Sequence, residues 1–281
     1  MPDPIPIPIA EDTPDGGVSS RSGFDVQTFP WWLLGMGAII GWMALSVVFS
    51  EAYQEALVEI LPGLKLTLLL TVGAFVVSMV LGVLIGLARV SKNVAFSSAA
   101  QVYIELIRGI PMLVFIFLIA FVLAPWFVDL FNWVFGTDHR TRDLAPNAWR
   151  GGVALSLFYA AFIAEVVRAG VQSVPKGQIE AGMALGLRRR TVLRQVTLPQ
   201  AFRNTFPALG NDLISLMKDT SLVSVIAAAE MTYEARIYQG SSFRVRETFF
   251  ILAVLYVILT LLLSLALRTI ESHIQIPGTD H

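Results

Sequence analysis

Polar side chains interrupt an otherwise apolar segment at residues 207–228. Asp212 and Asp219 are seven residues apart, so a helix would place both carboxyl groups on one face. The polar residues that accompany them are Asn211, Ser215 and Thr220. A charge inside a bilayer costs roughly 2.5–3.5 kcal/mol on insertion scales, so such groups face a cavity or a partner. The stripe would suit an amino group or a cationic side chain; alternatively, Lys218 and Asp219 hold the fold.

Residues and motifs for covalent or hydrolytic chemistry are missing from the sequence. With no cysteine, disulfides, thiolate metal sites and cysteine nucleophiles are excluded. Two of the three histidines, His273 and His281, are near the C-terminus, which argues against a histidine-rich metal centre. The patterns Gly-x-x-x-x-Gly-Lys-Ser/Thr, His-Glu-x-x-His and Gly-x-Ser-x-Gly do not occur. We predict no catalytic residue, no metal site and no cofactor in this chain.

A long polar connection at residues 173–206 predicts two short helices with a turn between them. Ser173 and Pro175 are helix start signals. Apolar residues recur every four positions in the first helix, at Ile179, Met183 and Leu187. Gly186 suits the left-handed residue that ends such a helix.

The second helix is expected from about Arg189 to Thr197, where Pro199 would stop it. Its apolar side holds Val192, Leu193 and Val196, and its other side holds Arg190 and Arg194. Such a helix pair would lie on the membrane surface, pack on its own bundle, or insert its apolar stripe into a groove on a partner. Composition alone leaves all three open.

The composition is that of a membrane protein that crosses the bilayer several times. Of 281 residues, 55% are hydrophobic and 15% are charged, and the net charge of −1 argues against a nucleic-acid-binding surface. We predict an all-α membrane protein, because its apolar runs approach the roughly 20 residues that cross a bilayer. The six expected spans are 31–50, 64–88, 104–128, 150–171, 207–228 and 248–268.

Several short patterns predict how these spans pack. Ser78, Gly82 and Gly86 are spaced by four residues, which lets another helix approach closely. This spacing fits packing inside one subunit or a dimer seam. Glu165 and Arg168 are three apart and could pair. The run from Arg108 through Gly109 and Ile110 to Pro111 predicts a kink.

The distribution of Lys and Arg predicts that both termini are cytoplasmic. With that orientation, 13 of the 20 Lys and Arg residues lie on or toward the cytoplasmic side. Residues 1–30 are rich in Pro, Gly and Ser and predict a disordered cytoplasmic tail without the basic start of a secretory signal. Residues 271–281 are expected to form a C-terminal tail.

Within 173–206, the sequence resembles the EAA loop of binding-protein-dependent ABC importer permeases. The family pattern is Glu-Ala-Ala, three residues, Gly, nine residues, Ile, any residue, Leu-Pro. The matching residues are Glu180, Ala181, Gly182, Gly186, Val196, Leu198 and Pro199. Gly182 replaces Ala and Val196 replaces Ile, while the spacing is kept.

Neighbouring segments are similar to the polar amino-acid permeases, which take up histidine, glutamine, glutamate or arginine. They begin at Arg108, Ile163, Ser173 and Leu216, and the similarity covers about residues 53–270. The extra span at 31–50 and the N-terminal tail fall outside it.

The resemblance implies a type I ABC importer permease fold, with a coupling helix that docks on a separate ATPase. Its implied contact residues are Glu180, Ala181, Gly182, Gly186, Leu187, Arg188, Leu198 and Pro199. The implied partners are two ABC ATPases carrying ATP and Mg, a second permease, an extracytoplasmic amino-acid-binding protein and the lipid of the inner membrane. The chain itself would be no enzyme and would bind no nucleic acid. An ion-gradient-driven secondary amino-acid carrier and a membrane scaffold are the alternatives.

Overall fold

The computed structural model describes residues 35, 37–38, 41–42, 45 and 50–274. The chain divides into two units at residue 45, and only the second, 45–281, is treated below. The predicted tail at 1–30 lies outside the described residues, as does most of the predicted span 31–50. The last helix extends to Ile274, so the first four residues of the predicted C-terminal tail are helical, and 275–281 lie outside the described residues.

From residue 50 to 274, every regular element is helical, as the sequence predicts. The first half contains α2 (Glu51–Ile60), η1 (Leu61–Gly63), α3 (Leu64–Arg89), α4 (Val94–Gly109), α5 (Met112–Phe117), η2 (Leu118–Leu123), α6 (Ala124–Phe135) and α7 (Thr141–Leu144). The second half contains α8 (Asn147–Gln172), α9 (Lys176–Ala184), α10 (Arg189–Val192), η3 (Leu193–Thr197), α11 (Leu198–Asp219), η4 (Thr220–Ile226), α12 (Met231–Ser242) and α13 (Val245–Ile274).

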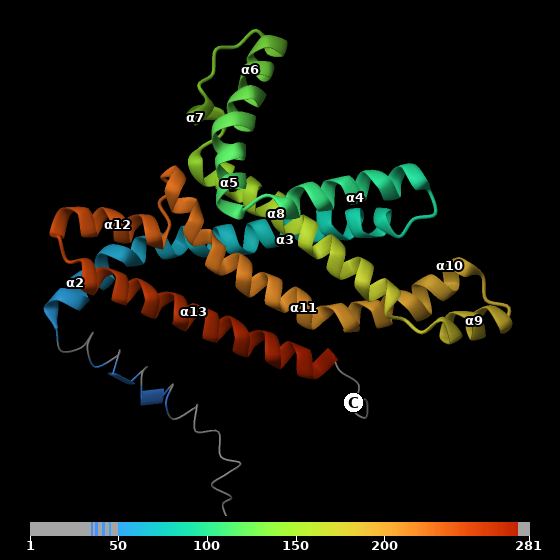
Figure 1. Cartoon of the computed structure of the whole chain (residues 1–281). Helices are drawn as coiled ribbons and strands as arrows, with labels where there is room; N and C mark the ends of the chain where they lie inside the picture. The colour runs from blue at the N-terminus through green and yellow to red at the C-terminus, as the bar shows by residue number, and fades with distance from the viewer. Residues whose placement is uncertain (1–34, 36, 39–40, 43–44, 46–49, 275–281) are drawn as a thin grey trace, which may run out of the picture. The chain divides into compact units, whose positions relative to one another are not determined.

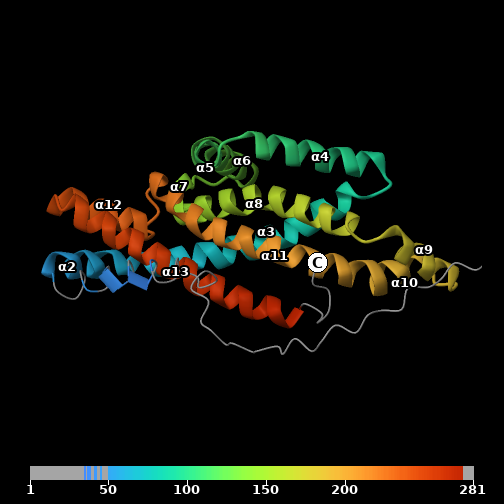
Figure 2. The same cartoon turned by 60° about the horizontal axis from the view of Figure 1, so that its bottom comes forward.

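The long helices α3, α8, α11 and α13 run roughly side by side (Figures 1 and 2). Helix α4 covers α8, while α2 and α12 lie at one end of the bundle and α9 and α10 at the other (Figure 2). The largest cluster of buried apolar residues joins α3, α5, α8 and α11 around Leu155, Ile116 and Leu216, each 0% exposed. This core therefore packs the central helices of the bundle against one another.

The seam between α3 and α8 is made by the three small residues that the sequence singles out. The hydroxyl of Ser78 lies 2.7 Å from the carbonyl oxygen of Ala74 on its own helix and 3.0 Å from that of Ser156 across the seam, so its one proton is shared between two acceptors. A Cβ on Gly82 would lie 2.6 Å from Ile163, and one on Gly86 would lie 2.7 Å from the carbonyl oxygen of Ala164. The three small residues therefore allow α3 and α8 to pack closely within the chain, because larger side chains there would force the two backbones apart.

Four helical segments in the described part of the chain are long and apolar enough to cross a membrane: Glu51–Arg89, Met112–Phe135, Asn147–Gln172 and Val245–Glu271. They contain the predicted spans 64–88, 150–171 and 248–268. The predicted start of the third span at 104 is wrong, because α4 ends at Gly109 and a new helix begins at Met112. Helix α11, which overlaps the predicted span 207–228, is not among these four segments, and the polar stripe lowers its hydropathy.

The break before the third span is caused by Pro111. Ile110 is extended, with φ −100° and ψ 130°, because the residue before a proline avoids the helical region. Helices α5 and α6, joined by η2, then run at a steep angle to the long helices of the bundle (Figure 1). They are seen nearly end-on in Figure 2. The predicted kink is confirmed as a complete break between helices.

The segment η2, which joins α5 to α6, is a π-helix. In it, the amide of Ala124 donates to the carbonyl of Ile119. The next donor in that five-residue register would be residue 125, but Pro125 has no N–H. The guanidinium of Arg150, only 9% exposed, donates to the carbonyl of Ala120 at 3.5 Å. Arg150 therefore supplies a donor where the proline cannot.

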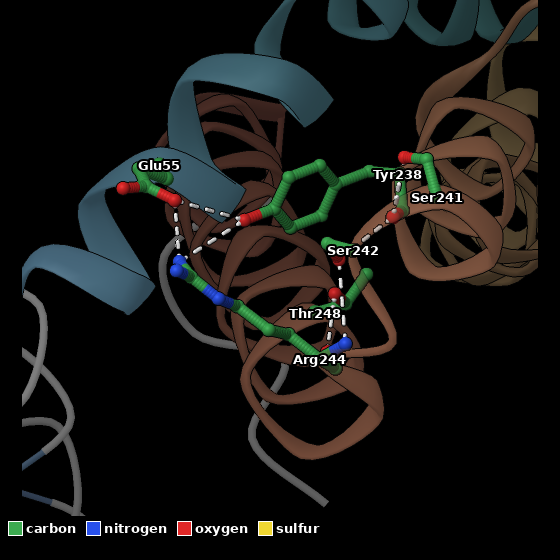
Figure 3. A network of polar contacts seen from close by, with 6 residues as sticks. All are labelled: Glu55, Tyr238, Ser241, Ser242, Arg244 and Thr248. Atoms are coloured by element: carbon green, nitrogen blue, oxygen red, sulfur yellow. Dashed lines mark hydrogen bonds and ion pairs between the residues drawn. The ribbon is translucent and has the colours of Figure 1, made fainter.

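The end of the bundle near α2 and α12 is held by polar contacts (Figure 3). The Arg244 guanidinium pairs with the carboxylate of Glu55 on α2, and this carboxylate raises the pKa of Arg244. The hydroxyl of Tyr238 on α12 donates to the same carboxylate at 3.4 Å. Deeper in this end, the buried carboxylate of Glu230 accepts from the hydroxyl of Tyr256 at 3.0 Å. Helices α2, α12 and α13 are thus fastened together.

Candidate functional site

The first candidate site is the turn between α9 and α10, where the sequence predicts a left-handed glycine. Gly186 has φ +79°, which confirms the prediction. Its amide donates to the carbonyl of Met183 at 3.0 Å, and the amide of Leu187 donates to the carbonyl of Gly182 at 3.2 Å. These two bonds satisfy carbonyls left free at the helix end, and a residue with a side chain at position 186 would be strained.

Gly182 lies at the contact between the two short helices. A Cβ on Gly182 would lie 3.1 Å from a methyl group of Val192, which is 1% exposed, and 3.9 Å from the side chain of Leu187. Gly182 is one of the two positions at which the sequence departs from the EAA pattern. The glycine lets α9 approach α10, so the turn is compact.

The expected end of the second helix at Pro199 is wrong. Leu198 keeps a helical conformation, with φ −62° and ψ −42°, and α10, η3 and α11 continue one after another from Arg189 to Asp219. The π-helix η3 explains this, because its wider turn moves the preceding carbonyls away from the proline ring. As a result, the turn connects directly to the long helix α11.

Side-chain hydrogen bonds join the base of α11 to α9 and to the end of α8. The amide of Gln200 donates to the side-chain oxygen of Gln178 on α9 at 2.5 Å. The amide of Asn204 donates to the hydroxyl of Ser173 at 2.8 Å, and that hydroxyl donates to the carbonyl of Gly170 on α8 at 2.8 Å. The first bond therefore ties α9 to α11, and the second ties the end of α8 to α11.

Most of the predicted contact residues of the turn are exposed. Gly182 is buried, and the exposed ones are Glu180, Ala181, Gly186, Leu187, Arg188, Leu198 and Pro199. The apolar residues at the tip include Leu185 at 83% exposure and Met183 at 39%. Leu185 was missed by the stripe pattern because it lies off the four-residue repeat; its position directly before the left-handed glycine was the available signal.

The polar stripe on α11 is the second candidate site. The hydroxyl of Tyr159 on α8 donates to the carboxylate of Asp219 at 2.8 Å. Oδ2 of Asp212 is buried and makes no hydrogen bond within the described residues. Lys218 is exposed, and the ion pairs of the described residues do not include it, so Asp219 is held by Tyr159 and not by Lys218.

The remaining residues of the stripe do not share one surface. Asn211 lines a cleft of about 190 Å³ between α11 and α13. Thr220 is 0% exposed and donates to the carbonyl of Met217 on its own helix at 2.7 Å. Ser215 is exposed. The structure thus brings Asp219 to Tyr159, a partner that the sequence did not indicate.

The predicted pair of Glu165 and Arg168 is present on α8 and is confirmed. Arg168 also donates to the side chain of Gln172, one turn further on. The pair is local to its helix, and we assign it no part in the two candidate sites.

The fold is shared with solved ABC transporters. An amino acid ABC transporter crystallised with histidines has a chain that is 35% identical, with a TM-score of 0.66 over 76% of this chain and 94% of that one. The MetNI methionine ABC transporter in an inward-facing conformation shares the fold at 22% identity, with a TM-score of 0.62 over 81% of this chain and all of that chain. The fold is therefore that of the membrane subunit of an ABC transporter.

The sequence places the chain within a defined family. Residues 78–276 match the family described as binding-protein-dependent transport system inner membrane component, and the chain belongs to it. The glutamine transport system permease protein GlnP of Escherichia coli (strain K12) is 38% identical over 226 residues, covering 80% of this chain and 97% of GlnP. The L-cystine transport system permease protein TcyB of Bacillus subtilis (strain 168) is 36% identical over 244 residues, covering 86% and 94%. The chain is a permease subunit of a binding-protein-dependent ABC transporter.

Proposed function

We propose that this chain imports a polar amino acid across the cytoplasmic membrane by alternating access, driven by ATP that a separate subunit hydrolyses. In this proposal the permease works with a second permease, identical or paralogous, with two ATPases that carry ATP and Mg, and with an extracytoplasmic binding protein. The family match supports an ATPase and a binding protein as partner classes.

The observation that carries the proposal is the exposed apolar tip of the α9–α10 turn. Leu185 is 83% exposed at the end of a helix whose backbone is fixed by Gly186. An apolar tip on a rigid turn suits a groove on a partner protein. The bonds to α8 and α11 would carry the partner's motion into the bundle, and the coupling role of the predicted contact residues follows from this.

The charge distribution supports an orientation in which the α9–α10 end of the bundle faces the cytoplasm. Arg188, Arg189, Arg190 and Arg194 lie in this region, whereas Glu51, Glu55 and Glu59 lie on α2 at the opposite end. Basic residues favour the cytoplasmic side. In this proposal α2 and α12 face the binding protein, and both termini are cytoplasmic if the predicted span 31–50 crosses the membrane once.

The substrate class rests on the relatives and on the polar stripe. The names of GlnP and TcyB state glutamine and L-cystine transport. In the stripe, Asp212 has a carboxylate oxygen without a hydrogen-bond partner among the described residues, and Asp219 is held in place by Tyr159. We assign Asn211, Asp212, Ser215, Asp219 and Thr220 to the substrate path, with Thr220 acting from within the packed helix.

The coupling role is tested by placing a charge at the tip of the turn. The chain is produced with its ATPase and binding protein, and uptake of labelled amino acids into vesicles is measured for Leu185→Asp. The substitution replaces a central apolar contact with a carboxylate that would be buried in the partner's apolar groove. Uptake should therefore fall about tenfold or more, and the ATPase should no longer co-purify.

The matched control is Leu144→Asp, the same substitution at a 38% exposed leucine on α7. It should leave both uptake and co-purification unchanged. Wild-type uptake and ATPase binding in Leu185→Asp would contradict the coupling role. Uptake by the chain without any ATPase, driven by an ion gradient, would instead support a secondary carrier.

A further inference from the structure

An apolar groove of about 140 Å³ lies between α3, α8 and α11, on the side of the bundle near the turn. Val83 and Leu87 of α3, Val171 of α8, and Leu198 and Phe202 of α11 line it. The groove opens outward, since Leu87, Leu198 and Phe202 are 40%, 40% and 51% exposed. Its surface is almost entirely apolar, so it suits a hydrocarbon chain.

Two arginines precede the groove residues Leu198 and Phe202 on the same face of one helical run. Arg190, Arg194, Leu198 and Phe202 are spaced by four residues along the continuous helical run of α10, η3 and α11, so they lie on roughly the same face. Both arginine side chains are exposed. A groove that takes hydrocarbon thus leads to two guanidinium groups.

The chain segment that contains these arginines carries only positive charges. From Ala181 to Asn211 the chain has five arginines and no Asp or Glu. The ion pairs among the described residues involve none of these arginines. Guanidinium groups bind phosphate oxygens with two parallel hydrogen bonds, and basic residues beside a membrane-spanning helix attract anionic lipids.

We propose that this groove and the two arginines bind an anionic phospholipid of the inner leaflet. One acyl chain lies between α3, α8 and α11, and the phosphate lies at Arg190 and Arg194. The assignment to the inner leaflet rests on the orientation given under the proposed function. Because these residues lie on the continuous run of α10, η3 and α11, the bound lipid would stabilise the connection between the turn and α11.

The test measures the phosphatidylglycerol retained by the assembled transporter. The complex is purified from a membrane that contains phosphatidylglycerol and phosphatidylcholine, and the retained lipids are quantified by mass spectrometry. Each arginine near an anionic surface strengthens binding about fivefold, so Arg190→Gln combined with Arg194→Gln should weaken phosphatidylglycerol binding about 30-fold. Phosphatidylcholine retention should not change.

The matched control combines Arg189→Gln with Arg203→Gln, which removes the same charge from positions off the groove face. It should retain phosphatidylglycerol as the wild type does. Val83→Trp fills the groove with a bulky apolar side chain and should exclude the lipid while both arginines remain. Equal retention in the Arg190/Arg194 variant, or equal loss in the control, would overturn the proposal.

Two further outcomes would overturn the lipid proposal, because they would assign the arginines or the groove to a protein partner. Loss of the ATPase from the Arg190/Arg194 variant with unchanged lipid retention assigns the arginines to the ATPase. Dissociation of the two permeases by Val83→Trp with unchanged lipid retention assigns the groove to the second permease. Lipid retention does not require transport, so a wild-type complex that binds the lipid but does not couple to ATP would refute only the proposed function.

Discussion

The seam between α3 and α8 and the turn between α9 and α10 both depend on glycines, but for different reasons. At the seam, Gly82 and Gly86 have helical backbones, and neighbouring atoms lie within 3 Å of where their side chains would begin. In the turn, Gly186 has open space around it and a positive φ. The first region needs glycine for space and the second for backbone conformation.

This difference distinguishes the seam, whose contacts are all made within the chain, from the turn, which we expect to bind a partner. The seam buries its contacts within the chain, and its polar group, Ser78, finds an acceptor on α8. The turn keeps its backbone rigid while it exposes Leu185. Rigid structure combined with exposed apolar side chains is a mark of an interaction surface.

The largest effect is expected from Gly86→Leu. The Cβ alone would lie 2.7 Å from a backbone oxygen of α8, so a leucine must push the two helices apart. Overpacking of this kind costs about 3 kcal/mol or more. We expect little folded protein and a lower melting temperature, measured by thermal denaturation of the chain in detergent.

Gly73→Leu is the matched control, since Gly73 is on the same helix and has nothing within 4 Å of its added Cβ. It should fold as the wild type does. If both variants were equally stable, the seam would not depend on the close approach of α3 and α8.

An intermediate effect is expected from Gly186→Ala. The left-handed conformation costs a residue with a side chain about 1–2 kcal/mol, so the turn would change shape or loosen. Uptake by the complete transporter should fall about tenfold, because 1.4 kcal/mol corresponds to that factor. The melting temperature of the permease should stay near that of the wild type, in contrast to the seam variant.

Gly177→Ala, in the helix that precedes the turn, provides the comparison. Gly177 also has open space around it, but it lies inside α9 without a positive φ. Its uptake should be unchanged. A loss of uptake equal to that of Gly186→Ala would show that the turn needs small residues rather than a left-handed one.

The smallest effect is expected from Asp212→Asn, on the helix that connects the two regions. The substitution keeps the size of the side chain and removes its charge. Because partly solvated charge pairs contribute up to about 1 kcal/mol, the apparent affinity for an amino acid should weaken by up to about fivefold, measured from the concentration dependence of uptake. Lys218→Gln, an exposed change on the same helix, should have no effect. Unchanged affinity and rate in Asp212→Asn would remove Asp212 from the path.

The sequence predicted those parts of the fold that depend on local chemistry. The apolar runs predicted three of the spans closely, the Ser78 ladder predicted a helix contact, and Gly186 predicted the end of α9. The start of the third span was wrong because the apolar run crosses Pro111 without a change in composition. The end at Pro199 was wrong because a π-helix, which the sequence pattern does not reveal, accommodates the proline.

Contacts between distant residues could not be predicted in the same way. Tyr159 and Asp219 are 60 residues apart, and only the packing of α8 on α11 brings them together. The apolar stripe identified the turn but not Leu185, because exposure depends on where the neighbouring helices lie. The polar stripe and Gly186 could be predicted from the sequence, whereas the exposed Leu185 and the partner of Asp219 required the fold.

Arg150 and Pro125 have a consequence for how relatives of this chain diverge. The proline removes a backbone donor from η2, and the arginine of α8 supplies one to Ala120. A chain with another residue at position 125 regains its own donor and no longer needs a cation buried there. The two positions are therefore expected to co-vary, although they are 25 residues apart and neither belongs to the turn nor to the polar stripe.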